Sequence, residues 1–449
     1  MSVQQREIEP LNVVIVGCGL GGLSCAIQCI RQKCKVTILE RAPELLPIGA
    51  GIVVPPNATR VLGHYGLVDS LLQKGAVPIT GARFLNFDDG SVLYQRRNRL
   101  SPEAQKLALD PACVTHRADY HDTLYEEAVR LGCTIRLGCE MQDVNFEEPA
   151  VILSDGTVVA ADVVVGADGL WSTFREKVLG RPAPPKPTGD LAYRMTLSGE
   201  DMAAIDDADV QELLKVNMST VWLGPDRHCV MYPIKKRTMW NLVLMGPDNI
   251  PEGIRTQAAT LEEMRSCFEG WEPRLQKILS QGHSAISWKL LHADELDVWS
   301  KGSCVLLGDA CHPSLPYQAQ GAAMALEDGI TLGVLLGSLN EVALSSSSQQ
   351  SVAQRNTYIP ELLSLFETLR KPRTTLNQKG SQSNQYWYQA STPEDRERRN
   401  KVMLAATGEG ECEWKGADLN YQKQLLGFDA KKSATEAFDK WRRKTQSPI

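Results

Sequence analysis

The chain has 449 residues, of which 43% are hydrophobic and 23% charged, with 48 basic and 54 acidic side chains. This composition is that of an ordinary folded protein of two or three domains and excludes a largely disordered chain. The net charge of −6 argues against nucleic acid as a partner, because affinity for phosphates needs clustered Lys and Arg.

The sequence shows no clear pattern of a membrane span, a secretory signal or a set of paired cysteines. The longest apolar stretch, 329–339, is about half of the roughly 20 residues that a membrane-spanning helix needs. The first ten residues, MSVQQREIEP, contain no apolar core of a secretory signal. The 12 cysteines include no CxxC pair and indicate reduced thiols rather than disulfides or a metal site. We therefore expect a cytoplasmic protein with no membrane span and no bound metal.

The first informative motif lies near the N-terminus. Residues 12–16 form a β-branched apolar run typical of a buried parallel strand, and the glycines Gly17, Gly19 and Gly22 follow at once. A helical pattern over 20–31 and a second apolar strand over 35–39 complete the unit, which ends on Glu40.

This spacing matches the fingerprint of a dinucleotide-binding turn. Its first glycine permits the tight turn, the second lets a pyrophosphate approach the backbone, and the third lets helix and strand pack closely. Glu40 stands where a carboxylate accepts hydrogen bonds from a ribose hydroxyl. The alternative is a glycine turn that only shapes the backbone.

Two later strands end in a similar way. Residues 163–165 lead into Gly166-Ala167-Asp168-Gly169, and residues 304–307 lead into Gly308-Asp309 and a helix over about 322–337. Because the carboxyl ends of parallel strands meet at one edge of a sheet, we expect these acids and glycines to lie close to the first glycine turn. A helix is predicted over 120–131.

Between these parts, residues 82–94 and 190–244 show short alternating strands with turns such as Asp89-Gly90. The predicted fold is α/β, with a Rossmann-like parallel sheet, an inserted and mostly antiparallel second sheet, and a C-terminal helical region. We assign nucleotide-binding segments to 1–82, 101–185 and 291–345, second-sheet segments to 83–100 and 186–290, and the helical region to 346–449.

Four motifs in this order resemble those of the single-component FAD-dependent aromatic hydroxylases, in the salicylate hydroxylase-like branch. They are the glycine turn with Glu40, the Asp168-Gly169 motif, THRADYHDTL with Arg117, and Gly308-Asp309 with its extension HPSLPYQAQGAAMALEDG. The resemblance covers residues 11–380 and implies tightly bound FAD. It also implies NAD(P)H as a transient co-substrate, because the chain has no second glycine fingerprint.

The resemblance also implies roles for individual residues. Gly17, Gly19 and Gly22 would hold the pyrophosphate and Glu40 the ribose, with Arg41 beside it. The other cofactor-binding residues would be Arg117, Asp168, Gly169, Asp309, Gly321 and Ala322. Asp168 as a helix cap and Arg117 as a surface ion pair are the alternatives. His312 is expected to structure its loop rather than to act in catalysis, and Glu327 and Asp328 are as well explained by structure as by function.

In this family a flavin hydroperoxide hydroxylates an electron-rich ring, and the protein deprotonates a phenol and excludes water. His228 and Tyr232 stand four residues apart on one predicted strand, hence on the same face, and are the candidate catalytic pair. The alternative places both in the core. Arg194, Pro316 and Tyr317 are candidates for substrate binding, with a surface or interdomain ion pair as the alternative for Arg194.

The predicted function is the NAD(P)H- and O₂-dependent hydroxylation of a phenolic aromatic, salicylate-like or from secondary metabolism. Epoxidation or hydroxylation of an indole or another electron-rich alkene is the alternative within the same fold. A flavin oxidase or a non-catalytic flavin-binding protein is the alternative outside it. The amphipathic helical pattern near the C-terminus leaves open a homodimer contact or packing against the FAD-binding part.

Overall fold

A six-stranded sheet forms the centre of the first lobe in the computed structural model, which describes residues 9–46, 49–97, 111–346 and 354–445. The predicted strand–helix–strand unit is present as β1 (Asn12–Val16), α1 (Leu20–Arg31) and β2 (Lys35–Leu39). The strand order is β19-β20-β12-β1-β2-β8. The four remaining strands are β8 (Thr134–Arg136), β12 (Val163–Gly166), β19 (Ser300–Lys301) and β20 (Cys304–Leu306).

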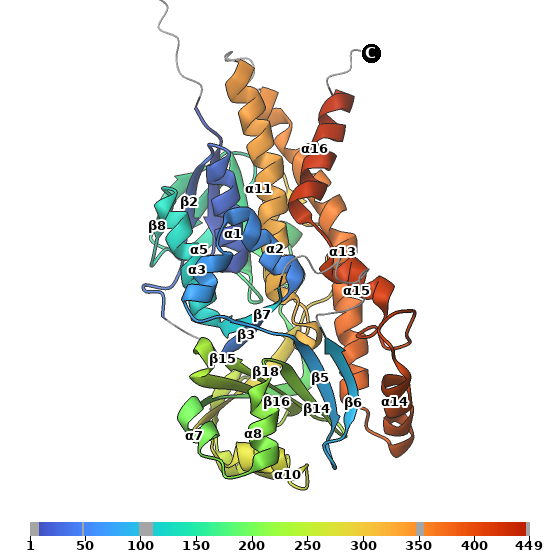
Figure 1. Ribbon diagram of the computed structural model, residues 1–449. Coiled ribbons are helices and arrows are strands. Elements are labelled where there is room, and N and C mark those ends of the chain that lie inside the picture. Colours follow the sequence, from blue (N-terminus) through green and yellow to red (C-terminus); the bar gives the residue numbers. More distant parts are fainter. Residues whose placement is uncertain (1–8, 47–48, 98–110, 347–353, 446–449) are drawn as a thin grey trace, which may run out of the picture.

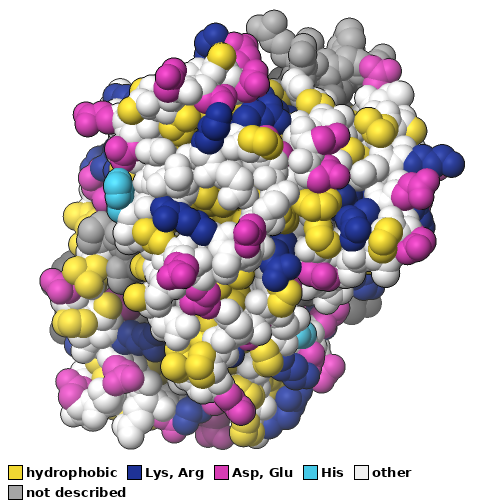
Figure 2. Space-filling model, turned by 90° about the horizontal axis from the view of Figure 1, so that it is seen from below, with side chains coloured by type: hydrophobic (Ala, Val, Ile, Leu, Met, Phe, Trp, Pro, Cys, Tyr) yellow, Lys and Arg dark blue, Asp and Glu magenta, His cyan; other side chains and the backbone are white. Residues whose placement is uncertain are grey.

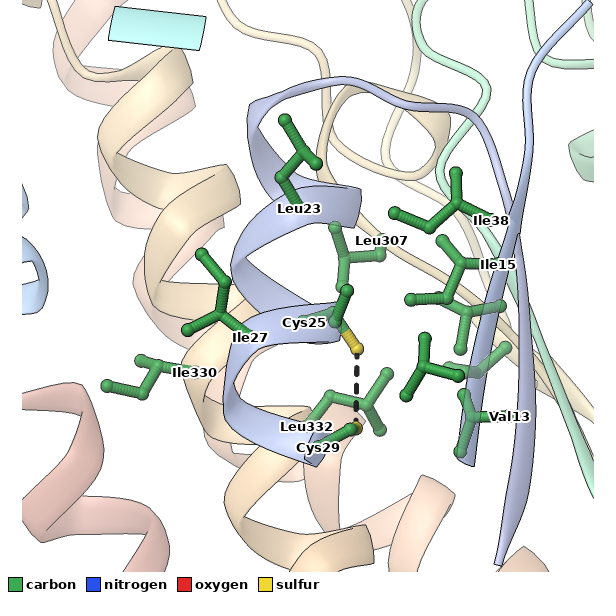
Figure 3. Packing of buried hydrophobic residues seen from close by; sticks show 14 of the residues in the cluster. Val13, Ile15, Leu23, Cys25, Ile27, Cys29, Ile38, Leu307, Ile330 and Leu332 are labelled. Carbon is green, nitrogen blue, oxygen red and sulfur yellow. Dashed lines mark hydrogen bonds between the residues drawn. The ribbon is translucent and has the colours of Figure 1, made fainter. Parts of the chain in front are cut away.

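All neighbours in this sheet are parallel except the edge pair β19–β20. The central strands consist of Val, Ile and Leu because helices or loops cover both faces of a parallel sheet. Helix α11 (Gly321–Ser346) lies along α1, which packs against the central strands β1 and β2 (Figure 3).

Three glycines let α1 and α11 approach closely. They stand at Gly329, Gly333 and Gly337, four residues apart on one face of α11. A Cβ at Gly329 would lie 2.6 Å from the backbone nitrogen of Cys25, and one at Gly333 would lie 2.6 Å from the Cβ of Gln28. The contact between the two helices therefore requires glycine on α11.

Helix α11 is longer than predicted. It is long and apolar enough by length and composition to cross a membrane, but 89% of its most apolar window is buried inside the protein. The predicted helix over about 322–337 ends nine residues before the helix does, and its Glu327 and Asp328 are buried beside arginines. Its burial is that of a core helix.

An eight-stranded, mostly antiparallel sheet forms the second lobe, below the first in Figure 1. Its order is β17-β18-β13-β16-β15-β14-β5-β6, with one parallel pair, β14–β5. The strands from the first segment are β5 (Gly81–Asn86) and β6 (Val92–Arg97). Those from the second are β13 (Lys186–Ser198), β14 (Ser219–Leu223), β15 (His228–Ile234), β16 (Met239–Pro247), β17 (Thr256–Ala259) and β18 (Ala285–His292).

The two faces of this sheet have different neighbours. Side chains such as Tyr193, Trp222 and Met231 point to one face and form a core with short helices. These helices are α7 (Gly199–Ala203), α8 (Ala208–Lys215), α9 (Leu261–Ser266) and α10 (Pro273–Leu279). His228, Val230 and Tyr232 alternate to the opposite face, which is directed toward the first lobe.

Smaller elements complete the first lobe and its junction with the second. A three-stranded sheet consists of β3 (Gly51–Val54), β4 (Val77–Pro78) and β7 (Cys113–His116). A second one consists of β9 (Met141–Asn145), β10 (Ala150–Leu153) and β11 (Val158–Ala160). The helices of this part are α2 (Pro56–Tyr65), α3 (Val68–Gln73), α5 (Arg117–Arg130) and α6 (Thr173–Leu179). Short 3₁₀ turns lie at η1 (Lys235–Arg237), η2 (Gly308–Ala310) and η3 (Pro316–Gln318). At the junction, β3, β4 and β7 contact β16, η1 and β15.

The C-terminal region is helical, as predicted, and runs along both lobes (Figure 1). It consists of α13 (Ile359–Tyr388), α14 (Pro393–Ala405), α15 (Leu419–Leu426) and α16 (Ala430–Thr445). Helix α16 buries Ala430, Ala434 and Phe438 in the core of the first lobe and contacts α11. The amphipathic face near the C-terminus therefore packs back on the chain.

Charges of both signs are interspersed on the surface. On the face shown in Figure 2, the Lys and Arg side chains alternate with Asp and Glu over the described residues and do not gather into one basic patch. All 12 cysteines are free, and ten of them are buried.

Candidate functional site

The glycine turn lies at the carboxyl edge of the parallel sheet. The Gly17 N–H donates to Leu39 O at 2.8 Å, and the Ala167 N–H donates to Val16 O at 2.8 Å, so the ends of three neighbouring strands are tied together. The predicted meeting of strand ends at one edge is confirmed.

Each glycine of the turn has different surroundings. Gly17 has φ +108°, and a Cβ there would lie 2.3 Å from Ala167 O. A Cβ at Gly22 would lie 2.4 Å from Gly17 O. A Cβ at Gly19 meets nothing within 4 Å. The first and third glycines are therefore required by the fold itself, and the second borders open space at the start of α1, where N–H groups and the helix dipole favour a phosphate.

Glu40 is held at the same edge. Its Oε2 accepts a hydrogen bond from the Cys18 N–H at 2.8 Å, and its Oε1 accepts one from the Ala42 N–H at 2.9 Å. The carboxylate is thus fixed beside the glycine turn, and the exposed Arg41 follows it. This position is compatible with a ribose contact, which stays a prediction.

Asp168 lies just before helix α6, whose N-cap residue is Ser172. Its Oδ1 accepts from the Ser172 Oγ at 2.5 Å and its Oδ2 from the Phe174 N–H at 3.0 Å, at the start of α6. Burial raises the pKa of the Asp168 carboxyl. Asp168 therefore supports the start of α6 without being its N-cap residue, and a cofactor contact stays a prediction. Gly169 has φ +79° and open space around it.

The last strand end places Asp309 in the first turn after β20. Its side chain reaches solvent but is closely surrounded by protein, and this burial raises the pKa of its carboxyl. Arg117 is exposed at the start of α5, and Gly321 and Ala322 begin α11 with N–H groups of the first turn. No described acidic side chain pairs with Arg117 within 4.0 Å, which disfavours the surface ion pair.

Behind this edge lies a buried ionic network. Arg370 Nε donates to Asp328 Oδ1 at 2.6 Å, and its Nη1 donates to Glu327 Oε2 at 2.8 Å. Arg373 holds both oxygens of Glu327 at 2.6 Å. His312 Nε2 bonds Asp328 Oδ2 at 2.5 Å. Burial alone would raise the pKa of Asp328, but His312 and Arg370 lower it to about 2. The structural interpretation of His312, Glu327 and Asp328 is thereby confirmed.

The edge fits FAD. It combines a glycine turn open toward a helix N-terminus, a fixed carboxylate at the next strand end, and a second helix N-terminus at Gly321 beside Asp309. No group of three or more His, Cys, Asp or Glu that could hold a metal ion occurs in the part of the chain that the structure describes.

Next to this edge lies a hollow, which we call the main cavity. Its volume is about 1440 Å³, including solvent at its mouth, and its surface is mostly apolar. It lies between the sheet of the second lobe, the turn η3 and the C-terminal helices. Its aromatic lining consists of Phe84, Tyr94, His228, Tyr317, Tyr388 and Trp414.

The structure separates the predicted substrate residues into two groups. His228, Pro316 and Tyr317 line the main cavity, and the His228 ring lies 5.4 Å from the Tyr317 ring and 5.3 Å from the Tyr388 ring. Tyr232 packs under Gly51, and Arg194 stacks 5.3 Å from the Trp288 ring.

Tyr232 and Arg194, the second group, lie on the same part of the sheet. They project from the same face of the sheet, and Tyr232 partly offsets the lowering of the Arg194 pKa that burial causes. The Nε of Arg194 is buried without a hydrogen-bond partner among the described residues, and burial lowers its pKa. Tyr232 and Arg194 are thus adjacent to the main cavity without lining it.

His228 is electrostatically unusual. It is 1% exposed, its Nδ1 has no hydrogen-bond partner among the described residues, and burial lowers its pKa to about 3. At neutral pH its imidazole is therefore uncharged. A neutral imidazole has one ring nitrogen that can accept a hydrogen bond from a ligand.

Sequence reasoning missed one wall of the cavity. Residues 408–426 contribute Trp414, Leu419, Gln422 and Leu425 to its lining. Trp414 packs edge-on against Phe84 and Tyr94 at ring distances of 4.9 and 5.2 Å. The signal that the sequence analysis drew from this region was an amphipathic helical pattern, which does not indicate a contact with the substrate cavity.

The fold and this site define a flavoprotein with a separate substrate cavity. A family model described as "FAD binding domain" matches residues 10–355, and the chain belongs to this family. The FAD-dependent monooxygenase OpS4 of Beauveria bassiana (strain ARSEF 2860) is 35% identical over 434 residues, which cover 94% of this chain and 96% of that protein.

Two further comparisons agree. The 3-hydroxybenzoate 6-hydroxylase 1 of Aquipseudomonas alcaligenes is 36% identical over 73% of this chain and 80% of its own. A solved structure of a salicylate hydroxylase substrate complex shares the fold with a TM-score of 0.77 at 24% identity, covering 96% of this chain and 98% of that one. The chain is an FAD-dependent monooxygenase that uses NAD(P)H and O₂.

Proposed function

We propose that this monooxygenase hydroxylates a phenolic aromatic compound, salicylate-like or belonging to secondary metabolism, in the cytoplasm. The observation that carries the proposal is the uncharged, unpartnered His228 in the aromatic wall of the main cavity. The relatives named 3-hydroxybenzoate 6-hydroxylase and 6-hydroxynicotinate 3-monooxygenase support a hydroxylated ring as substrate.

Each part of the site has a task in this proposal. FAD would be held by Gly17, Gly19, Gly22 and the start of α11. When bound, FAD would accept a hydride from NAD(P)H and transfer an oxygen atom to the substrate. The aromatic lining would receive the ring of the substrate by stacking and edge contacts and would exclude water. His228 would accept the hydrogen bond of the phenol, which makes the ring more electron-rich.

The remaining candidates surround this position. Pro316 and Tyr317 would border the substrate from the turn η3, close to the start of α11. Arg194 and Tyr232 would act from the adjoining part of the sheet, where the buried Arg194 favours an anionic group. A homodimer and the absence of nucleic-acid partners stay predictions.

The test is NAD(P)H oxidation in air by the FAD-loaded protein, with a panel of phenols, salicylates and indoles. We expect a phenol to stimulate oxidation and to yield a product one oxygen atom heavier by mass spectrometry. Peroxide alone with every panel member would contradict the proposal and indicate an oxidase.

A matched pair of variants separates phenol from indole chemistry. His228→Ala should lower kcat/KM for the phenol by about 10²- to 10⁴-fold, because the acceptor for the phenol proton is lost. His64→Ala is the control, since His64 lies on α2 outside the cavity and pairs with Asp429. Full activity of His228→Ala on an indole would favour the epoxidation alternative.

A further inference from the structure

One charged side chain lines the main cavity among the described residues. It is the half-buried Arg96 on β6, at the edge of the eight-stranded sheet, whereas His228 on β15 is uncharged at neutral pH. The rest of the lining is apolar or carries uncharged amides and hydroxyls. A cation on such a surface loses part of its hydration, and an anion that comes to lie beside it restores that loss.

Within the described part of the chain, no carboxylate supplies this anion. The Arg96 Nη1 donates to Gln422 Oε1 at 2.9 Å, and this amide oxygen is a neutral acceptor. Asp418, four residues before Gln422, pairs with Lys415 instead. Among the described residues the positive charge of Arg96 is therefore not compensated by an ion pair.

The guanidinium is held from the side of the C-terminal segment. Gln422 Nε2 donates to Lys415 O at 2.9 Å, which fixes the amide with its oxygen toward Arg96. Burial raises the pKa of the Tyr94 and Tyr388 hydroxyls, and the charge of Arg96 lowers both in part. Both tyrosines line the main cavity, so the positive charge acts within it.

The sheet provides a floor of small side chains beside Arg96. Arg96 is paired across the strands with Ala82, and Ala82 with Ser219, so all three point to the same face. Ala82 and Ser219 also line the main cavity. A ligand can therefore lie over these two small residues with one end at the guanidinium.

Arg96 and His228 are separated diagonally across this floor. Three strand spacings lie between β6 and β15, which is roughly 14 Å. His228 is paired with Leu223, four residues beyond the Ser219 that shares the row of Arg96, which adds roughly 13 Å along the strands. Because side chains stand nearly perpendicular to a sheet, a small ring acid does not reach both ends, whereas a longer molecule does.

We propose that Arg96 determines the substrate class by holding a carboxylate at the far end of an extended molecule whose phenolic ring lies at His228. The remaining N–H groups of the guanidinium donate to the carboxylate, as charge-assisted hydrogen bonds. Rings between the two ends cover the apolar body of the molecule, since Phe84 lies 5.8 Å from the Tyr388 ring and 4.9 Å from the Trp414 ring.

The substrate class is thus a phenol with a long carboxylic acid side chain. Its acid group is remote from the hydroxylated ring, unlike the ring acid in the name of the relative 3-hydroxybenzoate 6-hydroxylase 1. This assignment rests on the proposed function in one respect, that the reacting ring is a phenol.

The test measures binding without turnover. The probes are straight-chain acids that carry a 4-hydroxyphenyl group at the far end, from 4-hydroxyphenylacetate to 8-(4-hydroxyphenyl)octanoate, and the primary amide of each. Each probe is titrated into the FAD-loaded full chain by isothermal titration calorimetry at pH 7, where the acids are ionised, with no NAD(P)H present. The ratio of acid affinity to amide affinity reports the carboxylate contact.

We expect this ratio to rise with chain length and to reach about 10- to 100-fold in the wild type. Arg96→Met should bring the ratio close to one and leave the amides bound as before, and Arg96→Lys should keep part of it. Gln422→Glu should also lower the ratio, because a carboxylate of the protein then competes for Arg96. Lys401→Met is the matched control, since it removes an exposed cation from α14, which packs against β6 outside the cavity.

Three results would overturn the assignment. One is a ratio close to one, or no binding, for every acid in the wild type. Another is an unchanged ratio in both Arg96→Met and Gln422→Glu, and the third is an equal loss in Lys401→Met. The flavin spectrum and the midpoint of thermal unfolding report whether each variant is folded. If no phenol is oxygenated in the turnover panel, the proposed function fails, while the affinity ratios still decide on Arg96.

Discussion

The Gly51 N–H donates to Asn241 Oδ1 at 2.7 Å, and this hydrogen bond joins strand β3 to strand β16 of the second lobe. A Cβ at Gly51 would lie 2.6 Å from the Asn241 side chain and 2.6 Å from the Tyr232 ring. The junction between the lobes is therefore closely packed at the point where the candidate site lies.

Removing the amide should destabilise this junction. In Asn241→Ala the partly buried Gly51 N–H loses its acceptor on the buried Asn241 side chain, and we expect the free energy of unfolding to fall by about 1–3 kcal/mol. Asn249→Ala is the control, because Asn249 is exposed and should change stability by less than about 0.5 kcal/mol. Equal effects of the two substitutions in urea unfolding would show that the junction contributes nothing.

The buried ionic network should be far more sensitive than a surface ion pair. Arg370→Met leaves Glu327 and Asp328 with one cation fewer in a fully buried place, and we expect a loss of about 3–5 kcal/mol. Arg398→Met, which removes an exposed pair with Glu413, should leave the unfolding midpoint nearly unchanged. A loss of less than about 1 kcal/mol in Arg370→Met would mean that the network relaxes or takes up a proton.

Two glycines of the nucleotide turn should respond differently to alanine. Gly22→Ala places a Cβ against Gly17 O and should destabilise the protein even without FAD. Gly19→Ala meets no protein atom within 4 Å, so the apoprotein should keep its unfolding midpoint while its affinity for FAD falls by about tenfold or more. Thermal unfolding of the apoprotein and FAD titration by flavin fluorescence measure the two effects separately. An unchanged FAD affinity in Gly19→Ala would remove this glycine from the cofactor site.

His228 should make the protein sensitive to acid. Because burial lowers its pKa to about 3, the folded chain binds fewer protons than the unfolded chain between pH 3 and the ordinary histidine pKa of 6.5. Its contribution to stability is therefore complete above pH 6.5 and is lost as the pH falls through this window. Compared with His228→Asn, the wild type should lose about 1.4 kcal/mol more per pH unit there. Parallel pH profiles of the two proteins in denaturant unfolding would contradict the buried, uncharged state.

Much of the nucleotide-binding part follows from local sequence. The apolar run before Gly17, the helix after it and the second strand ending at Glu40 need only neighbouring residues to form. Parallel strands all present their carboxyl ends at one edge, so the placement of Asp168 and Asp309 beside that turn followed as well. Asp168 also shows the limit of this reasoning, since its bonds to Ser172 and Phe174 became visible only in the structure.

The substrate site depended on tertiary structure. The two-residue period of a strand placed His228 and Tyr232 on one face, but only the elements packed on that face decide what each side chain contacts. Gly51 covers Tyr232, whereas η3 and α13 leave a cavity beside His228. Trp414 and the hydrogen-bonded pair of Tyr317 and Asp190 come from segments distant in sequence. Local patterns thus determined the nucleotide-binding unit, and long-range packing alone decided the shape of the cavity and the side chains that line it.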